Sequence, residues 1–150
     1  MLLVVIALTL AMSAQTADKD AFDAIHKIGG DLRVIHAPKG DQSWAEIRDD
    51  MITNQKPAIL DMEKQTERLR RIPLSKLKGA NDVCAQYFWA QIVPSFYDLA
   101  HLNKRLLEFA ERTPTMTPES RQDFKQLYET QRALRQRGQY IDEHDPCRDK

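Results

Sequence analysis

The chain has 150 residues, enough for one domain with a single hydrophobic core. Its 22 Lys and Arg residues are balanced by 22 Asp and Glu residues, so it lacks the basic excess that generic DNA or RNA binding requires. Only 5 Gly and 7 Pro occur, which favours helices over a β-sandwich or a β-barrel.

The chain opens with an uncharged apolar run over residues 2–12, followed by small residues. This pattern predicts a secretory signal peptide over residues 1–14, cleaved after Ala14 or after Ser13. The alternative is an uncleaved anchor, but the run is shorter than the roughly 20 apolar residues of a spanning helix. We therefore expect a secreted protein, periplasmic in a bacterium and extracellular otherwise, with no stable membrane insertion after cleavage.

A first helix is expected over residues 16–36, with Thr16 as its N-cap. Apolar residues recur there at three- and four-residue steps and predict one buried stripe of Phe22, Ile25, Ile28, Leu32 and Ile35. Gly29 and Gly30 lie inside the stripe, where each costs helix stability. Either the helix continues through them, straight or kinked, or it ends there; we favour continuation.

Ser43 and Glu46 have the spacing of a capping box and predict the start of a second helix. Apolar residues then follow near-heptad spacing as far as Leu69. Pro57 lies in the middle of this run, where its ring displaces the Thr53 carbonyl and removes one hydrogen bond, so a kink or a break is expected. Residues 73–80 form a connection.

A third helix is expected to begin after Asn81, as its N-cap, and to continue to about Arg112. Its apolar face is wider than that of an ordinary surface helix, which predicts contact with several neighbours. Pro94 lies within it and leaves the Ala90 carbonyl without its partner, so a second bend is expected.

Thr117 as N-cap and Pro118 at the first helical position predict the start of the last helix. Gly138 is a natural residue to follow its end, and residues 139–150 read as a polar tail. Together these elements predict an all-α, up-and-down bundle of about four helices over residues 15–138, kinked at Pro57 and Pro94.

Cys84, near the start of the third helix, and Cys147, in the tail, are the only cysteines. If the third and last helices run antiparallel, the tail is long enough to bring Cys147 beside Cys84. In an oxidising compartment the two residues are expected to pair and to tie the tail back. The alternatives are two free thiols or a bridge between two chains of a dimer.

The sequence contains no C-x-x-C, H-E-x-x-H, G-x-S-x-G or Gly-rich phosphate-binding motif. We therefore name no catalytic, cofactor-binding or metal-binding residue, and we lean against an enzyme. Haem held between His36 and either Met51 or Met62 is conceivable in a helix bundle, but Met in an apolar stripe is ordinarily core filler.

Basic side chains gather over residues 64–78 and along the last helix. If the two stretches lie side by side, they form a patch suited to an acidic protein or an anionic membrane surface. A solvated helix face is the more common role for such charges.

Because catalytic motifs are missing, we expect this protein to bind another protein. Its role would be that of an inhibitor, an immunity-type protein or a stress factor. Residues 116–122 resemble the helix starts of the periplasmic Spy/CpxP-like chaperone and stress proteins, with Met116 and Ser120 departing from that pattern, and no family is assigned. A bent, widely apolar helix is expected to leave a groove. The candidate partner-binding residues are Trp44, Trp89, Phe96, Tyr97, Arg132 and Arg135. The alternative function is a carrier of an apolar small molecule or haem within the bundle.

Overall fold

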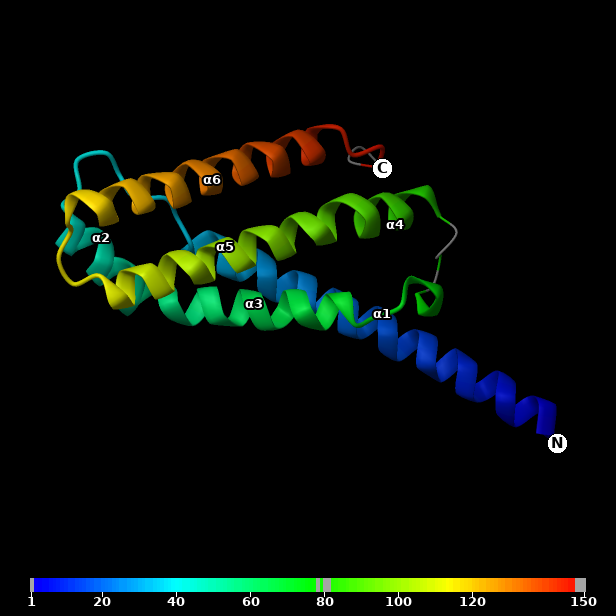
Figure 1. Cartoon of the computed structure of the whole chain (residues 1–150). Coiled ribbons are helices and arrows are strands. Elements are labelled where there is room, and N and C mark those ends of the chain that lie inside the picture. The colour runs from blue at the N-terminus through cyan, green and yellow to red at the C-terminus, as the bar shows by residue number, and fades with distance from the viewer. Residues whose placement is uncertain (1, 78, 80–81, 148–150) are drawn as a thin grey trace.

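The computed structural model describes residues 2–77, 79 and 82–147, which contain helices and no strand. The α-helices in chain order are α1 (Leu2–Val34), α2 (Trp44–Asp50), α3 (Lys56–Arg70), α4 (Val83–Tyr87), α5 (Val93–Arg112) and α6 (Pro118–Glu143). Two π-helical turns, η1 (Met51–Gln55) and η3 (Phe88–Ile92), join α2 to α3 and α4 to α5, and η2 (Leu74–Lys76) is a short 3₁₀ turn. The chain runs up and down, with α1 packed on α3, α3 on α5 and α5 on α6 (Figure 1). The predicted all-α bundle is confirmed.

The first helix begins at Leu2, and the predicted start at Thr16 is therefore wrong for the full chain. Residues 2–15 are rich in Leu and Ala, which are strong helix formers, so nothing ends the helix before that position. Among the described residues, no helix combines the length and the apolar character needed to cross a membrane. The signal peptide over residues 1–14 stays a prediction.

The two predicted kinks take the form of π-helical turns that end two residues before each proline. Pro57 occupies the second position of α3 and Pro94 the second position of α5. A proline has no N–H to donate, and its ring crowds the carbonyl four residues earlier, which is Thr53 in η1 and Ala90 in η3. The wider π-turn accommodates that ring while the backbone stays helical.

The predicted caps of the second and last helices are confirmed. The Ser43 hydroxyl accepts from the Glu46 amide and the Glu46 carboxylate accepts from the Ser43 amide, at 3.3 and 2.7 Å. Thr117 caps α6, with Pro118 next to it. The predicted cap of the third helix is wrong: Asn81 lies outside the described residues, and Asp82 accepts from the Cys84 amide at 2.7 Å. Asp and Asn are equally good N-caps, so adjacent candidates cannot be separated by propensity.

The core consists of two clusters. The first, between α1, α3 and α5, is built around Ile28, Ile35, Ile59, Met62 and Leu69. The second packs Met51, Leu102, Leu106 and Ala110 against half-buried residues of α2 and α6. The prediction that Phe22 is buried is wrong, because its side chain is 70% exposed while Ala21 and Ala24 face the core. Small side chains let α1 approach α3 closely, which turns the larger Phe22 outwards.

Gly29 and Gly30 do not interrupt α1, and both are exposed. A Cβ atom built on either residue meets no atom within 4 Å, so neither glycine is required by a close approach. We expect the free energy of unfolding of the double variant Gly29→Ala/Gly30→Ala to exceed that of the parent protein by about 1 kcal/mol per position. The reason is that alanine restricts the conformations of the unfolded chain. Urea unfolding measures this gain, and an unchanged or lower midpoint would contradict it.

Candidate functional site

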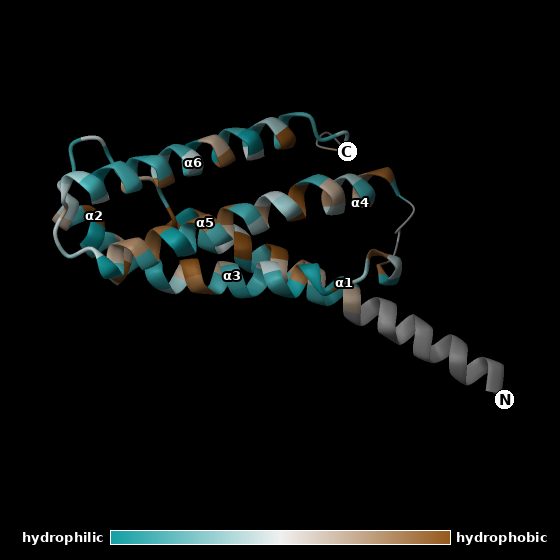
Figure 2. Cartoon of the chain, viewed as in Figure 1, coloured by the Kyte–Doolittle hydropathy of each residue, from teal (hydrophilic) through white to brown (hydrophobic). Residues whose placement is uncertain are grey.

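Helix α6 is attached to the bundle at three points along its length. At its start, α6 follows the short turn after α5. Near its middle, the Gln131 amide donates to the Asn103 side-chain oxygen at 2.6 Å, with both residues buried. Near its end, the Tyr87 hydroxyl donates to the Ile141 carbonyl at 2.8 Å. Gln131 and Ile141 are the fully buried residues of α6, while Phe124, Leu127 and Leu134 pack half-buried on the second core cluster. Most of the α6 surface is hydrophilic (Figure 2).

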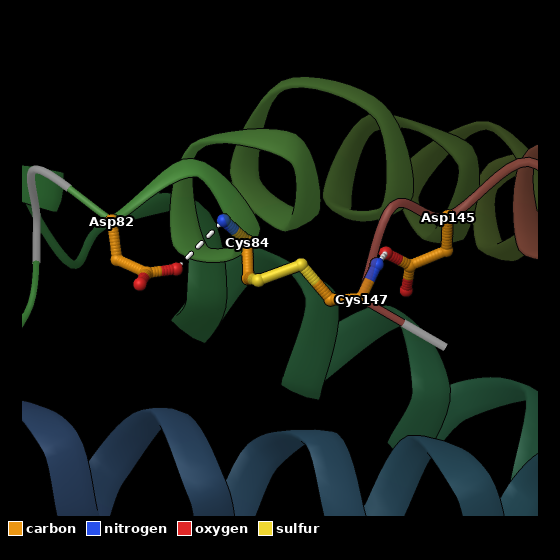
Figure 3. Close-up of a disulfide and its surroundings, with 4 residues drawn as sticks. All are labelled: Asp82, Cys84, Asp145 and Cys147. Atoms are coloured by element: carbon orange, nitrogen blue, oxygen red, sulfur yellow. Dashed lines mark hydrogen bonds between the residues drawn. A yellow bond between two sulfur atoms is a disulfide. The ribbon is translucent and has the colours of Figure 1, made fainter. Parts of the chain in front are cut away.

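A disulfide closes the end of this arrangement. Cys84, at the start of α4, and Cys147, beyond α6, are bonded with their Cα atoms 5.7 Å apart. Figure 3 shows that an aspartate two residues before each cysteine caps its backbone amide: Asp82 accepts from Cys84, and Asp145 from Cys147 at 2.9 Å. The predicted intramolecular bridge is confirmed. Such a bond fits a protein of an oxidising compartment.

A cavity of about 380 Å³, partly open to solvent, lies between α1, α5 and α6 just inside the disulfide end. We call it the α6 cavity. Most of its wall is apolar and comes from four segments of the chain: Leu32 of α1, Ile92 of η3, Phe96 and Leu99 of α5, and Leu134 and Ile141 of α6. The remaining wall is formed by Ser95, Arg135, Gly138 and Asp142. A concave, mostly apolar wall with few polar groups is typical of a small-molecule site.

Among the described residues that line the wall, Arg135 is the only one with a cationic side chain. It is half-buried, and one of its terminal nitrogens, Nη2, donates to the Ile35 carbonyl at 3.1 Å. Its Nε is buried without a hydrogen-bond partner, and Arg135 forms no salt bridge with a described residue. Burial lowers the pKa of Arg135 because it disfavours the charged form, while the nearby Tyr128 acts in the opposite direction.

Gly138 lines the α6 cavity from inside the helix. The predicted helix end at this residue is wrong, since α6 continues to Glu143 and buries Ile141. Gly138 has no positive φ, so it adopts ordinary helical geometry, and burial of Ile141 favours continuing the helix. A Cβ atom on Gly138 meets nothing within 4 Å. The first residues of the predicted tail, 139–143, are therefore helical.

A smaller polar site lies at the opposite end of α6. The His36 ring faces Asp50, with His36 Nε2 3.3 Å from Asp50 Oδ2, and Gln55 donates to the same carboxylate at 2.6 Å. The adjoining cavity, lined by His36 and Met51 among others, measures about 10 Å³, which is room for about one water molecule. Met62 is fully buried in the first cluster. Haem between these residues would require the bundle to open, and we do not propose it.

Asp31 of α1 carries a perturbed carboxyl group. One of its oxygens, Oδ2, is buried without a hydrogen-bond partner. Burial, and then the nearby Asp61 carboxylate, raise the pKa of Asp31 from 3.8 to about 6, against the opposing effect of Lys27. Because the folded-state pKa lies above the unfolded value, protonated Asp31 favours the folded state, and this contribution is lost as pH rises from 4 to 6.

We therefore expect Asp31→Asn to be more stable than the parent protein at pH 7 by about 1 kcal/mol, allowing for the solvent-exposed part of the side chain. The difference should shrink towards zero at pH 4, where the parent residue is itself protonated. Urea unfolding at pH 4, 5, 6 and 7 measures this, with Asp41→Asn in the exposed loop as control. A difference that does not change with pH would contradict the expectation.

The six candidate partner-binding residues do not gather on one surface. The Trp44 ring packs against Phe109 and Phe124, with centroids 5.7 and 5.1 Å away, and its Nε1 donates to the Thr113 carbonyl. Trp89 packs on the first core cluster, Tyr97 lies 4.0 Å beneath the Arg70 guanidinium, and Arg132 is exposed. The structure brings Phe96 and Arg135 together in the α6 cavity, and Trp89 and Tyr97 together in a separate open cavity of about 340 Å³.

The two basic stretches also stay apart. Helices α3 and α6 pack on α5 and not substantially on each other (Figure 1). Within the first stretch, Arg68 pairs with Asp20 at 2.6 Å and Arg70 with Glu67 at 3.3 Å. The continuous patch that would form if they were neighbours is therefore not present in the described part of the chain.

A groove beside the bent third helix was expected from the sequence, but of the aromatic residues named for it only Phe96 lines the α6 cavity. The rest of the lining comes from residues that were expected to pack against one another. One signal was available: after Leu134 the last helix has a single aliphatic residue, Ile141. Such a helix cannot cover the wide apolar face predicted for the third helix, so part of that face stays uncovered.

No protein-family model matches this chain, and neither a curated protein nor a solved structure is significantly similar to it. Across the described residues, no group of three or more His, Cys, Asp or Glu side chains is placed to hold a metal ion. The α6 cavity is therefore identified from its geometry alone.

Proposed function

We propose that this chain is a secreted protein that binds an apolar small molecule in the α6 cavity. The observation that carries the proposal is the cavity itself: about 380 Å³, with six apolar side chains in its wall. That volume lies within the range of roughly 300–1,000 Å³ found for small-molecule sites. The predicted signal peptide and the Cys84–Cys147 bridge support secretion.

Binding of another protein, the function favoured by the sequence, stays a prediction. Its aromatic candidates Trp44, Trp89 and Phe96 are at least half-buried against the molecule's own residues, so they offer little surface to a partner. The α6 cavity has the size and the wall chemistry of a small-molecule site, and it supports the carrier role instead.

The test is an isothermal calorimetric titration of the folded, oxidised protein with decan-1-ol, an uncharged alcohol with a ten-carbon chain. We expect one molecule to bind per protein. Gly138→Leu should abolish binding, because its side chain would occupy the open space beside Gly138. Stability should be maintained or raised, since leucine is a better helix former than glycine.

The matched control is Gly30→Leu, which places the same side chain at an exposed glycine of α1 outside the cavity wall. It should bind decan-1-ol as the parent protein does. Absence of binding to the parent protein, or equal binding by the two leucine variants, would overturn the proposal. Secretion is tested separately by sequencing the N-terminus of the exported protein, which should begin at Gln15 or Ala14.

A further inference from the structure

We infer that the ligand of the α6 cavity is an amphipathic carboxylate, whose charged group binds the Arg135 guanidinium and whose apolar chain lies against α5 and α6. This inference rests on the proposed function and adds the chemical class of the ligand. It follows from the charge, the surroundings and the number of cations in the cavity wall.

The first step is the unbalanced charge of Arg135. Of the four other half-buried cations among the described residues, three are paired with carboxylates at 2.6 Å: Arg68 with Asp20, Lys104 with Glu63 and Lys56 with Glu111. The fourth, Arg48, donates to the Ala110 carbonyl and, unlike Arg135, does not line the α6 cavity. Arg135 has a single hydrogen bond, to a neutral carbonyl, and no carboxylate partner among the described residues. A partly buried charge without a counter-charge is unfavourable, and an anion in the cavity would supply one.

The second step is the chemistry of the guanidinium group. Arginine keeps its charge in proteins, so it cannot relieve the cost of burial by losing a proton. Its planar fork matches the two oxygens of a carboxylate, and such charge-assisted hydrogen bonds are stronger than neutral ones. Burial lowers the pKa of Arg135, which is the direction expected where solvation is already incomplete.

The third step is the count of charges in the wall. In the part of the wall that the structure describes, Arg135 is the only cation and Asp142 contributes one carboxylate from an exposed position. A single cation matches a ligand of charge −1, whereas a phosphate group of charge near −2 would meet one arginine and the repulsion of Asp142. The apolar remainder of the wall matches a hydrocarbon chain.

The experiment compares three probes with the same ten-carbon chain at pH 7.5 by isothermal calorimetry: decanoate, decan-1-ol and decylamine. Decanoate should bind about tenfold or more tightly than decan-1-ol, the margin expected of a charge-assisted hydrogen bond. Arg135→Gln should remove this margin and leave decan-1-ol binding within about twofold, and Arg135→Lys should restore part of it. Asp142→Asn should tighten decanoate binding about two- to threefold by removing a like charge.

Equal affinities for decanoate and decan-1-ol, both abolished by Gly138→Leu, would leave the proposed function standing and overturn this inference. Tighter binding of decylamine would also overturn it and would assign the charged contact to Asp142. Because Arg135 contacts the Ile35 carbonyl, Arg135→Gln could lose stability. In that case the inference is tested without Arg135→Gln. The affinities of the three probes for the parent protein, and the affinity of decanoate for Asp142→Asn, then decide it. If no probe binds the parent protein, the proposed function itself fails.

Discussion

Replacing both Cys84 and Cys147 with serine is expected to lower the free energy of unfolding by about 4 kcal/mol. The bridge joins residues separated by 63 positions, and without it the unfolded chain regains the conformational entropy of that loop. This is the largest effect on stability that we expect from any variant. It is a large share of the total, since a domain is usually stabilised by only about 5–15 kcal/mol. The variant should still fold, with both core clusters intact, at a much lower urea midpoint.

The same variant tests whether the bridge maintains the α6 cavity. The disulfide and the Tyr87–Ile141 hydrogen bond hold the last turns of α6, which carry Gly138 and Ile141. Without the bridge, we expect faster amide exchange over residues 134–143 and weaker decan-1-ol binding under conditions where the protein remains folded. Reduction of the parent protein is the matched control and should reproduce both effects. A stability loss below about 1 kcal/mol would contradict the loop-entropy argument.

Gln131→Leu is expected to cost about 2–3 kcal/mol, the second largest effect. Gln131 and Asn103 are 3% and 1% exposed and form the hydrogen bond that joins α6 to α5. In the variant the Asn103 side-chain oxygen loses that bond, and the Asn103 amide nitrogen is already buried without a hydrogen-bond partner. A buried polar group left without a partner costs far more than an intact hydrogen bond contributes.

The double variant Asn103→Leu/Gln131→Leu should recover most of that loss, because two apolar side chains of similar size leave no unsatisfied group. Urea unfolding of the parent, both single variants and the double variant closes a double-mutant cycle. We expect a coupling free energy of about 1–3 kcal/mol. Additive single effects would show that the pair does not act as a unit, and would contradict the expectation.

Features determined by neighbouring residues were predictable from the sequence. The Ser43–Glu46 capping box and the Thr117–Pro118 start each depend on a few adjacent residues and on local hydrogen bonds. The interruptions at Pro57 and Pro94 follow from the chemistry of proline alone, although their π-helical form was not foreseen.

Features determined by burial were not predictable in the same way. A helical stripe defines a broad arc, and the packing of α1 on α3 selected Ala21 and Ala24 within it instead of Phe22. Gly138 is a common residue after a helix end, yet α6 continues because Ile141 is buried beyond it. The unpaired charge of Arg135 becomes visible only when α1, α5 and α6 are placed together.

The sequence by itself determined the helical class, the order of the helices, the starts at Ser43 and Thr117 and the pairing of two cysteines, because each depends on local propensity or on counting residues. Only the tertiary structure decided which faces are buried, how far α6 extends and where the apolar face of α5 stays uncovered. These outcomes depend on how side chains far apart in the chain pack together. No local sequence pattern specifies which of them become buried.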